Sequence, residues 1–88
     1  MNVFVVTETV PSPNGDDTNV VGVYRRRADA VRRVNELFEL ECAEREWDLD
    51  KTADEHPESF TDMHGGVIGD MCEETGWVYW DITSHEVA

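Results

Sequence analysis

The side chains best suited to metal binding lie in one acidic stretch of this chain. They are His56, Asp62, His64 and Cys72. Zinc sites built from one local segment normally use close pairs such as Cys-x-x-Cys or His-x-x-x-His, whereas here only Asp62 and His64 are close in sequence. We therefore expect no metal and no other cofactor, and we interpret the histidines as surface residues of a polar loop.

Catalytic motifs are also missing from the sequence. Ser59 and Ser84 lack the Gly-x-Ser-x-Gly context of a nucleophile, and Cys72 has no neighbouring histidine. The run GGVIG at 65–69 lacks the lysine and hydroxyl residue of a phosphate-binding loop. Carboxylates are abundant, but no apolar pattern marks one for a raised pKa. We expect that the protein is not an enzyme.

The carboxylates are more informative as a surface. Twenty Asp and Glu face seven Lys and Arg, for a net charge of -13, which repels nucleic acid and anionic membranes and attracts basic proteins. We predict a carboxylate-rich partner-binding surface within residues 39–62, a region with only two cations, Arg45 and Lys51. Its residues are Glu39, Glu44, Glu46, Asp48, Asp50, Asp54, Glu55, Glu58 and Asp62.

The cations are clustered instead, because five of the seven lie within residues 25–33. Arg25, Arg26 and Arg27 precede the first turn of an expected helix, where the helix dipole is positive and a Ser, Thr, Asp or Asn cap is usual. Two explanations stay open: the three arginines pair with carboxylates of the acidic remainder, or they contact an anion or a partner at the strand-to-helix junction.

A helix is expected from about Ala28 to Glu46, because apolar residues recur there at steps of three and four. The stripe at these steps consists of Ala30, Val31, Val34, Leu37, Phe38, Glu41 and Cys42. On the polar face, helical spacing predicts three ion pairs, which are Asp29 with Arg33, Arg32 with Glu36, and Glu41 with Arg45.

Three β-rich segments, 2–9, 19–26 and 77–84, are expected to form a small antiparallel sheet. The predicted fold class is therefore α+β, a three-stranded sheet packed by one main helix. We expect a single domain over 1–88, with a core of 1–47 and 76–88 and an irregular acidic insertion at 48–75. Within the insertion, residues 56–66 and 67–76 are expected to hold short helical turns, with Pro57 and Gly65 near the ends of the first.

Both faces of the last strand are apolar, with Trp77 and Tyr79 on one side and Val78, Trp80 and Ile82 on the other. One helix covers only one face of a small sheet. The second face must then be covered by the acidic insertion, by a second copy of the chain or by another partner.

Cellular location follows from two absences. The N-terminus lacks the basic region of a signal peptide, and no apolar run approaches the length of a membrane span. Cys42 and Cys72 form no multi-cysteine framework, so we interpret them as buried apolar residues in a reducing compartment. We expect a cytoplasmic protein, in the host cytoplasm if the gene is viral.

The succession VFVVTE, NVVGVYRRRADAVRRVNEL and WVYWDIT resembles a small strand, strand, helix, strand domain of unknown function found in prokaryotes and their viruses. In that pattern the second strand ends in a hydrophobic-aromatic pair, here Val23 and Tyr24, and the helix packs its alanines, here Ala28 and Ala30, on the sheet. The chain departs from the pattern at Arg27, where a Ser or Asp cap is usual, and in the acidic insertion. The resemblance implies a fold and no site residues.

Two functional hypotheses account for the charge. The first is an acidic protein-interaction module, as in a viral inhibitor that mimics nucleic acid and blocks a nucleic-acid-binding host defence enzyme. The second is a halophilic housekeeping domain that acts as a homodimer through the second sheet face, because a high-salt cytosol selects acidic surfaces whatever a protein does.

Overall fold

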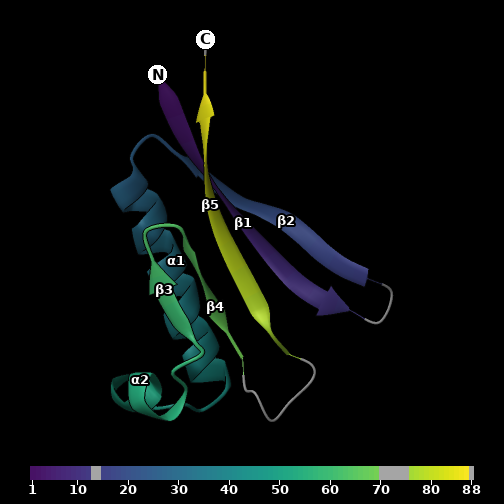
Figure 1. The fold of residues 1–88 in the computed structure, drawn as a ribbon, viewed down its shortest axis with the longest axis vertical. Helices are drawn as coiled ribbons and strands as arrows, with labels where there is room; N and C mark the ends of the chain where they lie inside the picture. The colour runs from purple at the N-terminus through teal and green to yellow at the C-terminus, as the bar shows by residue number, and fades with distance from the viewer. Residues whose placement is uncertain (13–14, 70–75, 88) are drawn as a thin grey trace.

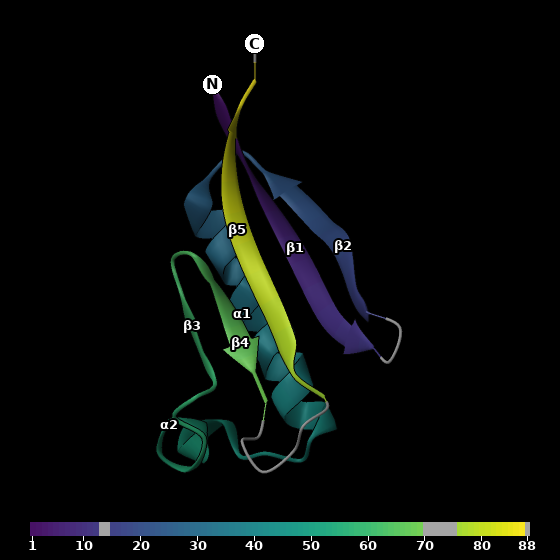
Figure 2. The same cartoon turned by 45° about the vertical axis from the view of Figure 1, so that its right-hand side comes forward.

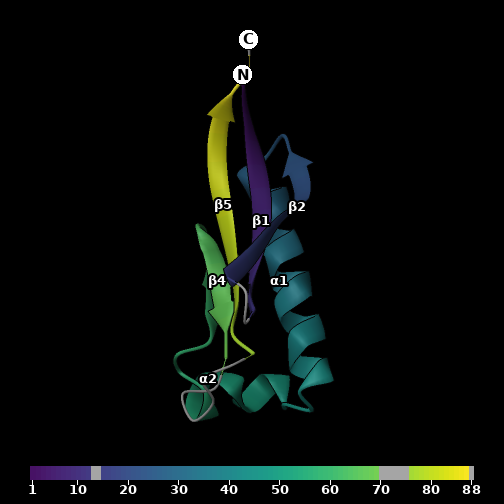
Figure 3. The same cartoon turned by 90° about the vertical axis from the view of Figure 1, so that its right-hand side faces the viewer.

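The computed structural model describes residues 1–12, 15–69 and 76–87, which form one antiparallel sheet with a long helix on one face (Figures 1 and 3). The α+β class predicted from the sequence is confirmed. In chain order the elements are β1 (Asn2–Ser12), β2 (Gly15–Tyr24), α1 (Arg27–Glu44), the 3-10 helix η1 (Leu49–Lys51), α2 (Thr52–Glu55), β3 (Phe60–Asp62), β4 (Gly65–Ile68) and β5 (Val78–Glu86).

The sheet has the strand order β2-β1-β5-β4-β3, and every neighbouring pair is antiparallel. The first and last strands of the chain therefore lie side by side, with Val6 opposite Ile82 and Glu8 opposite Trp80. Both termini lie at the end of the molecule that we call the upper end, and α2 lies at the opposite, lower end (Figure 1). The backbone N–H of Val87 donates to the carbonyl of Met1 at 2.8 Å.

The expectation of three strands is wrong, because the acidic insertion contributes two more. Residues expected to form helical turns instead form the β3–β4 hairpin, in which Asp62 lies opposite Gly65 across a two-residue connection. Gly65 has a φ of 140°, and a Cβ there would lie 1.9 Å from the carbonyl oxygen of Trp80. Only glycine fits this backbone conformation and this contact. The helical turn expected over 67–76 is wrong at Val67 and Ile68, which belong to β4, and residues 70–75 lie outside the described part.

The core lies between α1 and the sheet face that it covers. Its buried apolar residues are Val6, Ala30, Val34, Cys42, Ile68, Val78, Trp80 and Ile82. The ring of Phe38 packs edge-on against Trp80, with centroids 6.3 Å apart, and Val31 and Leu37 pack around the same cluster. The predicted apolar stripe of the helix is thus confirmed, as is the inward direction of the three alternate residues of β5.

Helix α1 ends in a turn that normally favours glycine. The N–H of Glu46 donates to the carbonyl of Ala43 at 3.1 Å, and the N–H of Trp47 donates to that of Cys42 at 2.9 Å. These two hydrogen bonds form a Schellman motif, in which the residue after the C-cap adopts a left-handed conformation. That residue is Glu46, with a φ of 60°. The helix therefore ends two residues earlier than predicted.

No helix in the described part of the chain is long and apolar enough to cross a membrane.

The other sheet face, which we call the open face, points away from α1 (Figure 3). The strand register places on it Val5, opposite Val23 and Thr83, and Thr7, opposite Val20 and Asp81. Thr9 lies opposite Tyr79, Tyr79 opposite Val67, and Val67 opposite Phe60, so the face extends across all five strands. Because β3 and β4 extend the sheet sideways, they do not cover this face.

Candidate functional site

Most of the predicted partner-binding carboxylates gather at the lower end of the molecule. They come from the last turns of α1, from the segment that follows it, from η1 and from α2 (Figures 1 and 2). We call this group the acidic end; its residues are Glu39, Glu44, Glu46, Asp48, Asp50, Asp54 and Glu55, and all of them are exposed. The structure therefore places at one end of the molecule residues that are spread over three elements.

Among the described residues, no Lys or Arg forms an ion pair with a carboxylate of the acidic end, although Lys51 of η1 lies between Asp50 and Asp54 in the sequence. The arginines of α1 and its C-cap pair with other carboxylates of the helix, which are Asp29 with Arg32 at 3.7 Å, Glu36 with Arg33 at 3.1 Å, and Glu41 with Arg45 at 3.5 Å. The pair Glu41–Arg45 confirms its prediction. The other two predictions are wrong in their partners, because Arg32 and Arg33 each take the carboxylate three residues away and not the one four residues away.

Two of the nine predicted residues stand apart from the acidic end. The carboxylate of Glu58 is half-buried and lies 3.6 Å from Nδ1 of His56. Asp62 belongs to β3, and its Oδ1 accepts a hydrogen bond of 2.7 Å from the backbone N–H of His64 in the β3–β4 turn. Both carboxylates thus have local structural partners.

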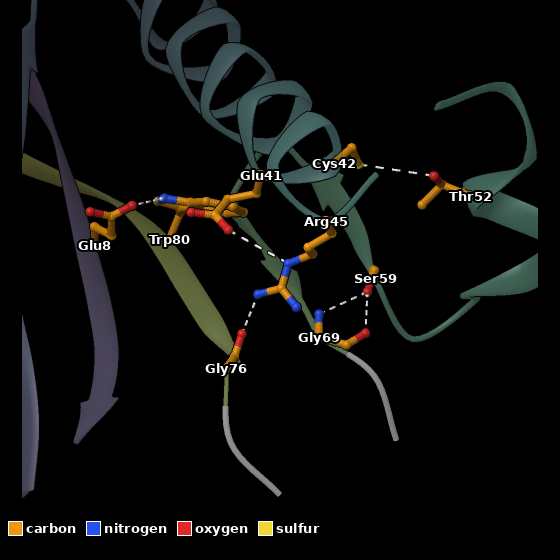
Figure 4. A network of polar contacts seen from close by, with 9 residues as sticks. All are labelled: Glu8, Glu41, Cys42, Arg45, Thr52, Ser59, Gly69, Gly76 and Trp80. Carbon is orange, nitrogen blue, oxygen red and sulfur yellow. Dashed lines mark hydrogen bonds and ion pairs between the residues drawn. The ribbon is translucent and has the colours of Figure 1, made fainter. Parts of the chain in front are cut away.

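Arg45 anchors the acidic end to the rest of the fold. Its side chain is only 18% exposed, and its guanidinium lies beside Glu41, donates to the carbonyl of Gly76 and sits 5.5 Å above the Trp47 ring (Figure 4). Trp47 in turn stacks on His56, with ring centroids 3.6 Å apart. One arginine therefore connects the end of α1 to the chain before β5 and to the segment after α2. Nothing in the sequence separates this arginine from the exposed ones.

The 3-10 helix and α2 are held by short polar contacts. Thr52, which is buried, donates from its hydroxyl to the carbonyl of Asp48 at 2.9 Å, and the carboxylate of Asp48 accepts from the N–H of Asp50 at 3.0 Å. The hydroxyl of Thr52 also lies 3.9 Å from Sγ of Cys42. These contacts fix the backbone and leave the carboxylates of Asp50, Asp54 and Glu55 directed to solvent.

Two carboxylates, Glu8 and Glu41, are partly buried beside Trp80. The indole Nε1 of Trp80 donates to Oε1 of Glu8 at 3.0 Å (Figure 4), and Glu8 is close enough to Glu41 for its charge to act on that carboxyl. Burial raises the pKa of Glu41, and the charges of Glu44 and Glu8 raise it further, while Arg45 opposes them. Because Glu8 accepts from Trp80 and Glu41 pairs with Arg45, we interpret both carboxylates as structural.

Of Arg25, Arg26 and Arg27, one has side-chain contacts with described residues and the other two do not. Arg27 donates to the carbonyl of Met63 in the β3–β4 turn at 2.7 Å, and its guanidinium lies 4.9 Å from the centre of the Phe4 ring. Arg25 and Arg26 are exposed and form no ion pair with any described residue. The interpretation that all three pair with carboxylates is therefore wrong for this part of the chain.

The remaining candidate sites are less favourable. His56 and His64 lie at opposite ends of β3, and the described residues contain no group of three or more metal-binding side chains, while Cys72 lies outside them. A pocket of about 290 Å³ lies between Tyr24 and α1 and is lined by Asp29, Arg32, Arg33 and Glu36. Its two cations and two anions already pair with one another, so it has little net attraction for a charged ligand.

No family model matches the chain, no curated protein is similar to it, and no solved structure resembles it.

Proposed function

We propose that this protein is a small acidic interaction module whose acidic end binds the basic surface of a nucleic-acid-binding protein and occupies the place of the nucleic acid. The observation that carries the proposal is a surface of seven exposed carboxylates with no cation paired to them among the described residues. Such a surface attracts a cationic groove over long range and accelerates association. If the gene is viral, the partner is a host defence enzyme and the effect is inhibition.

The placement of these charges supports the proposal, because local stability disfavours it. The C-terminus of a helix carries a partial negative charge, so each exposed carboxylate there costs about 0.3–1 kcal/mol. The last turn of α1 contains no cation, yet Glu44 lies in it and Glu46 follows it. Glu46 also occupies the left-handed position at which glycine is preferred. Residues kept against local stability are those that a binding function would select.

Adaptation to high salt is the alternative explanation of the acidity. The two explanations differ in whether the position of the carboxylates on the molecule matters. Selection by salt acts on net charge wherever it lies, whereas mimicry needs the carboxylates of the acidic end. Two variants with the same change in net charge therefore test the proposal. One carries Glu39→Lys, Glu44→Lys and Asp50→Lys; the control carries Asp16→Lys, Asp17→Lys and Glu86→Lys, which are all exposed and all outside the acidic end.

The experiment is capture of partners on each immobilised variant from the native host, followed by elution with a salt gradient and with double-stranded DNA. We expect the wild type and the control to retain a nucleic-acid-binding protein that DNA releases, and the acidic-end variant to bind it about tenfold or more weakly. Equal loss of binding in both variants would show that only net charge matters. A partner indifferent to DNA would exclude mimicry.

A further inference from the structure

The open face combines exposed apolar side chains with a low density of charge. Val20 and Val23 of β2 are 64% and 59% exposed, and Phe60 of β3 and Tyr79 of β5 are 51% and 43% exposed. Between them lie the half-buried Val5 and Val67. Asp81 lies in the middle of this face, and the strand register places Asp16 and Asp62 on the strands at its two edges. In a chain with a net charge of -13, a charge-poor apolar face is typical of the core of an interface.

The distribution of the exposed residues indicates that the whole face is covered. Val20 and Val23 lie on the strand at one edge of the sheet, and Phe60 lies on the strand at the other edge. A peptide that paired only with the free edge of β2 would leave Phe60 and Tyr79 in water. A flat partner that stacks on the sheet contacts all four.

We propose that the partner is a second copy of this chain, stacked face to face on the open face about a twofold axis, with the upper end of one copy over the lower end of the other. This proposal is independent of the function proposed for the acidic end. The long strands β1, β2 and β5 have 9 to 11 residues each, so their open face measures about 30 Å by 15 Å. Two such faces bury about 1,000 Å² or more in total, which is the lower range for a specific interface.

Charge selects the orientation of the two copies. Arg25 and Arg26 lie unpaired at the upper end, where β2 passes into α1, while Asp54 and Glu55 of α2 lie at the lower end, beneath the sheet (Figures 1 and 3). Placing like ends together would bring two acidic ends into contact. The opposite arrangement places the unpaired arginines of each copy near the α2 carboxylates of its partner. This accounts for both free arginines without an external anion.

The interface is tested by sedimentation equilibrium over a concentration series, with each variant checked by circular dichroism. We expect the wild type to dimerise, and Val23→Glu to raise the dissociation constant by about tenfold or more, because it buries an unpaired charge. Val10→Glu is the matched control, since Val10 is 40% exposed on the same hairpin but points to the covered side of the sheet; it should dimerise like the wild type. Asp81→Thr should tighten the dimer by removing two like charges. A wild type that remains monomeric at millimolar concentration, or equal effects of the two valine variants, would overturn the proposal.

The orientation is tested by reversing both charge groups. Arg25→Glu with Arg26→Glu should weaken the dimer, and Asp54→Arg with Glu55→Arg should weaken it as well. The chain carrying all four changes should recover most of the lost affinity, because its ends are again complementary. Failure of the fourfold variant to recover would exclude the opposed arrangement of the ends. Because Asp54 and Glu55 are unchanged in the variant that tests partner capture, either proposal can fail while the other stands.

Discussion

At the scale of single residues, Glu46 occupies a backbone position at which glycine would be more stable. Its left-handed φ of 60° costs a non-glycine residue about 1 kcal/mol relative to glycine. Glu46→Gly should therefore stabilise the protein by about 0.5–1 kcal/mol in urea unfolding, while it removes one carboxylate from the acidic end. Ala43→Gly, in the last turn of the same helix, should destabilise it by up to about 1 kcal/mol. Loss of stability in both variants would show that the Schellman turn is absent.

Glu41 gives a second prediction at this scale, because burial raises its pKa above the ordinary value of 4.5. The folded state then binds a proton that the unfolded state releases, so the contribution of Glu41 to stability falls as pH rises from 4.5 through the folded pKa. The free energy of unfolding of the wild type minus that of Glu41→Gln should decrease over this interval. Glu39→Gln, which changes an exposed carboxylate of the same helix, is the control. Parallel pH profiles of the wild type and Glu41→Gln would contradict the prediction.

At the scale of elements, the β3–β4 hairpin depends on one glycine. A Cβ at Gly65 would lie 1.9 Å from the backbone oxygen of Trp80, on the neighbouring strand β5, so Gly65→Ala must displace one of the two strands. We expect a loss of about 3 kcal/mol or more in the free energy of unfolding. Gly15→Ala is the matched control, because Gly15 also has a positive φ but has no atom within 4 Å of its Cβ position. It should cost only about 1–2 kcal/mol. Similar losses in the two variants would indicate that backbone strain alone, and not the contact with β5, makes glycine necessary at position 65.

At the scale of the whole molecule, net charge governs the response to salt. Seven exposed carboxylates repel one another at the lower end, so the melting temperature should rise with salt well beyond 0.15 M, at which the screening length is about 8 Å. Thermal unfolding from low to molar salt measures this. A melting temperature that is flat over the whole range would exclude high-salt adaptation as the source of the acidity. The variant with three lysines in the acidic end should show a smaller rise.

The α1–sheet core could be predicted from the sequence because its signals are local. Apolar residues at helical steps identified α1 and the side on which Val34 is buried, and alternation identified the two faces of β5. Charge counting placed the carboxylates in one region of the sequence, and seven of the nine selected residues are exposed on elements at the lower end. Their binding role remains a prediction. These features depend on periodicity and composition, which a chain carries before it folds.

The β3–β4 hairpin and the partners of the arginines were decided only by the tertiary structure. Phe60–Asp62 and Gly65–Ile68 are too short to show a strand period, and they become strands because β5 offers its free edge to β4. Arg27 and Arg45 donate to carbonyls that are 36 and 31 residues away in the sequence, while Arg25 and Arg26 remain free among the described residues. Charge pattern alone left open whether Arg25, Arg26 and Arg27 pair with carboxylates or contact an anion or a partner. The physical reason is that edge pairing and long-range hydrogen bonds depend on which segments the folded backbone brings together, and sequence spacing does not encode that proximity.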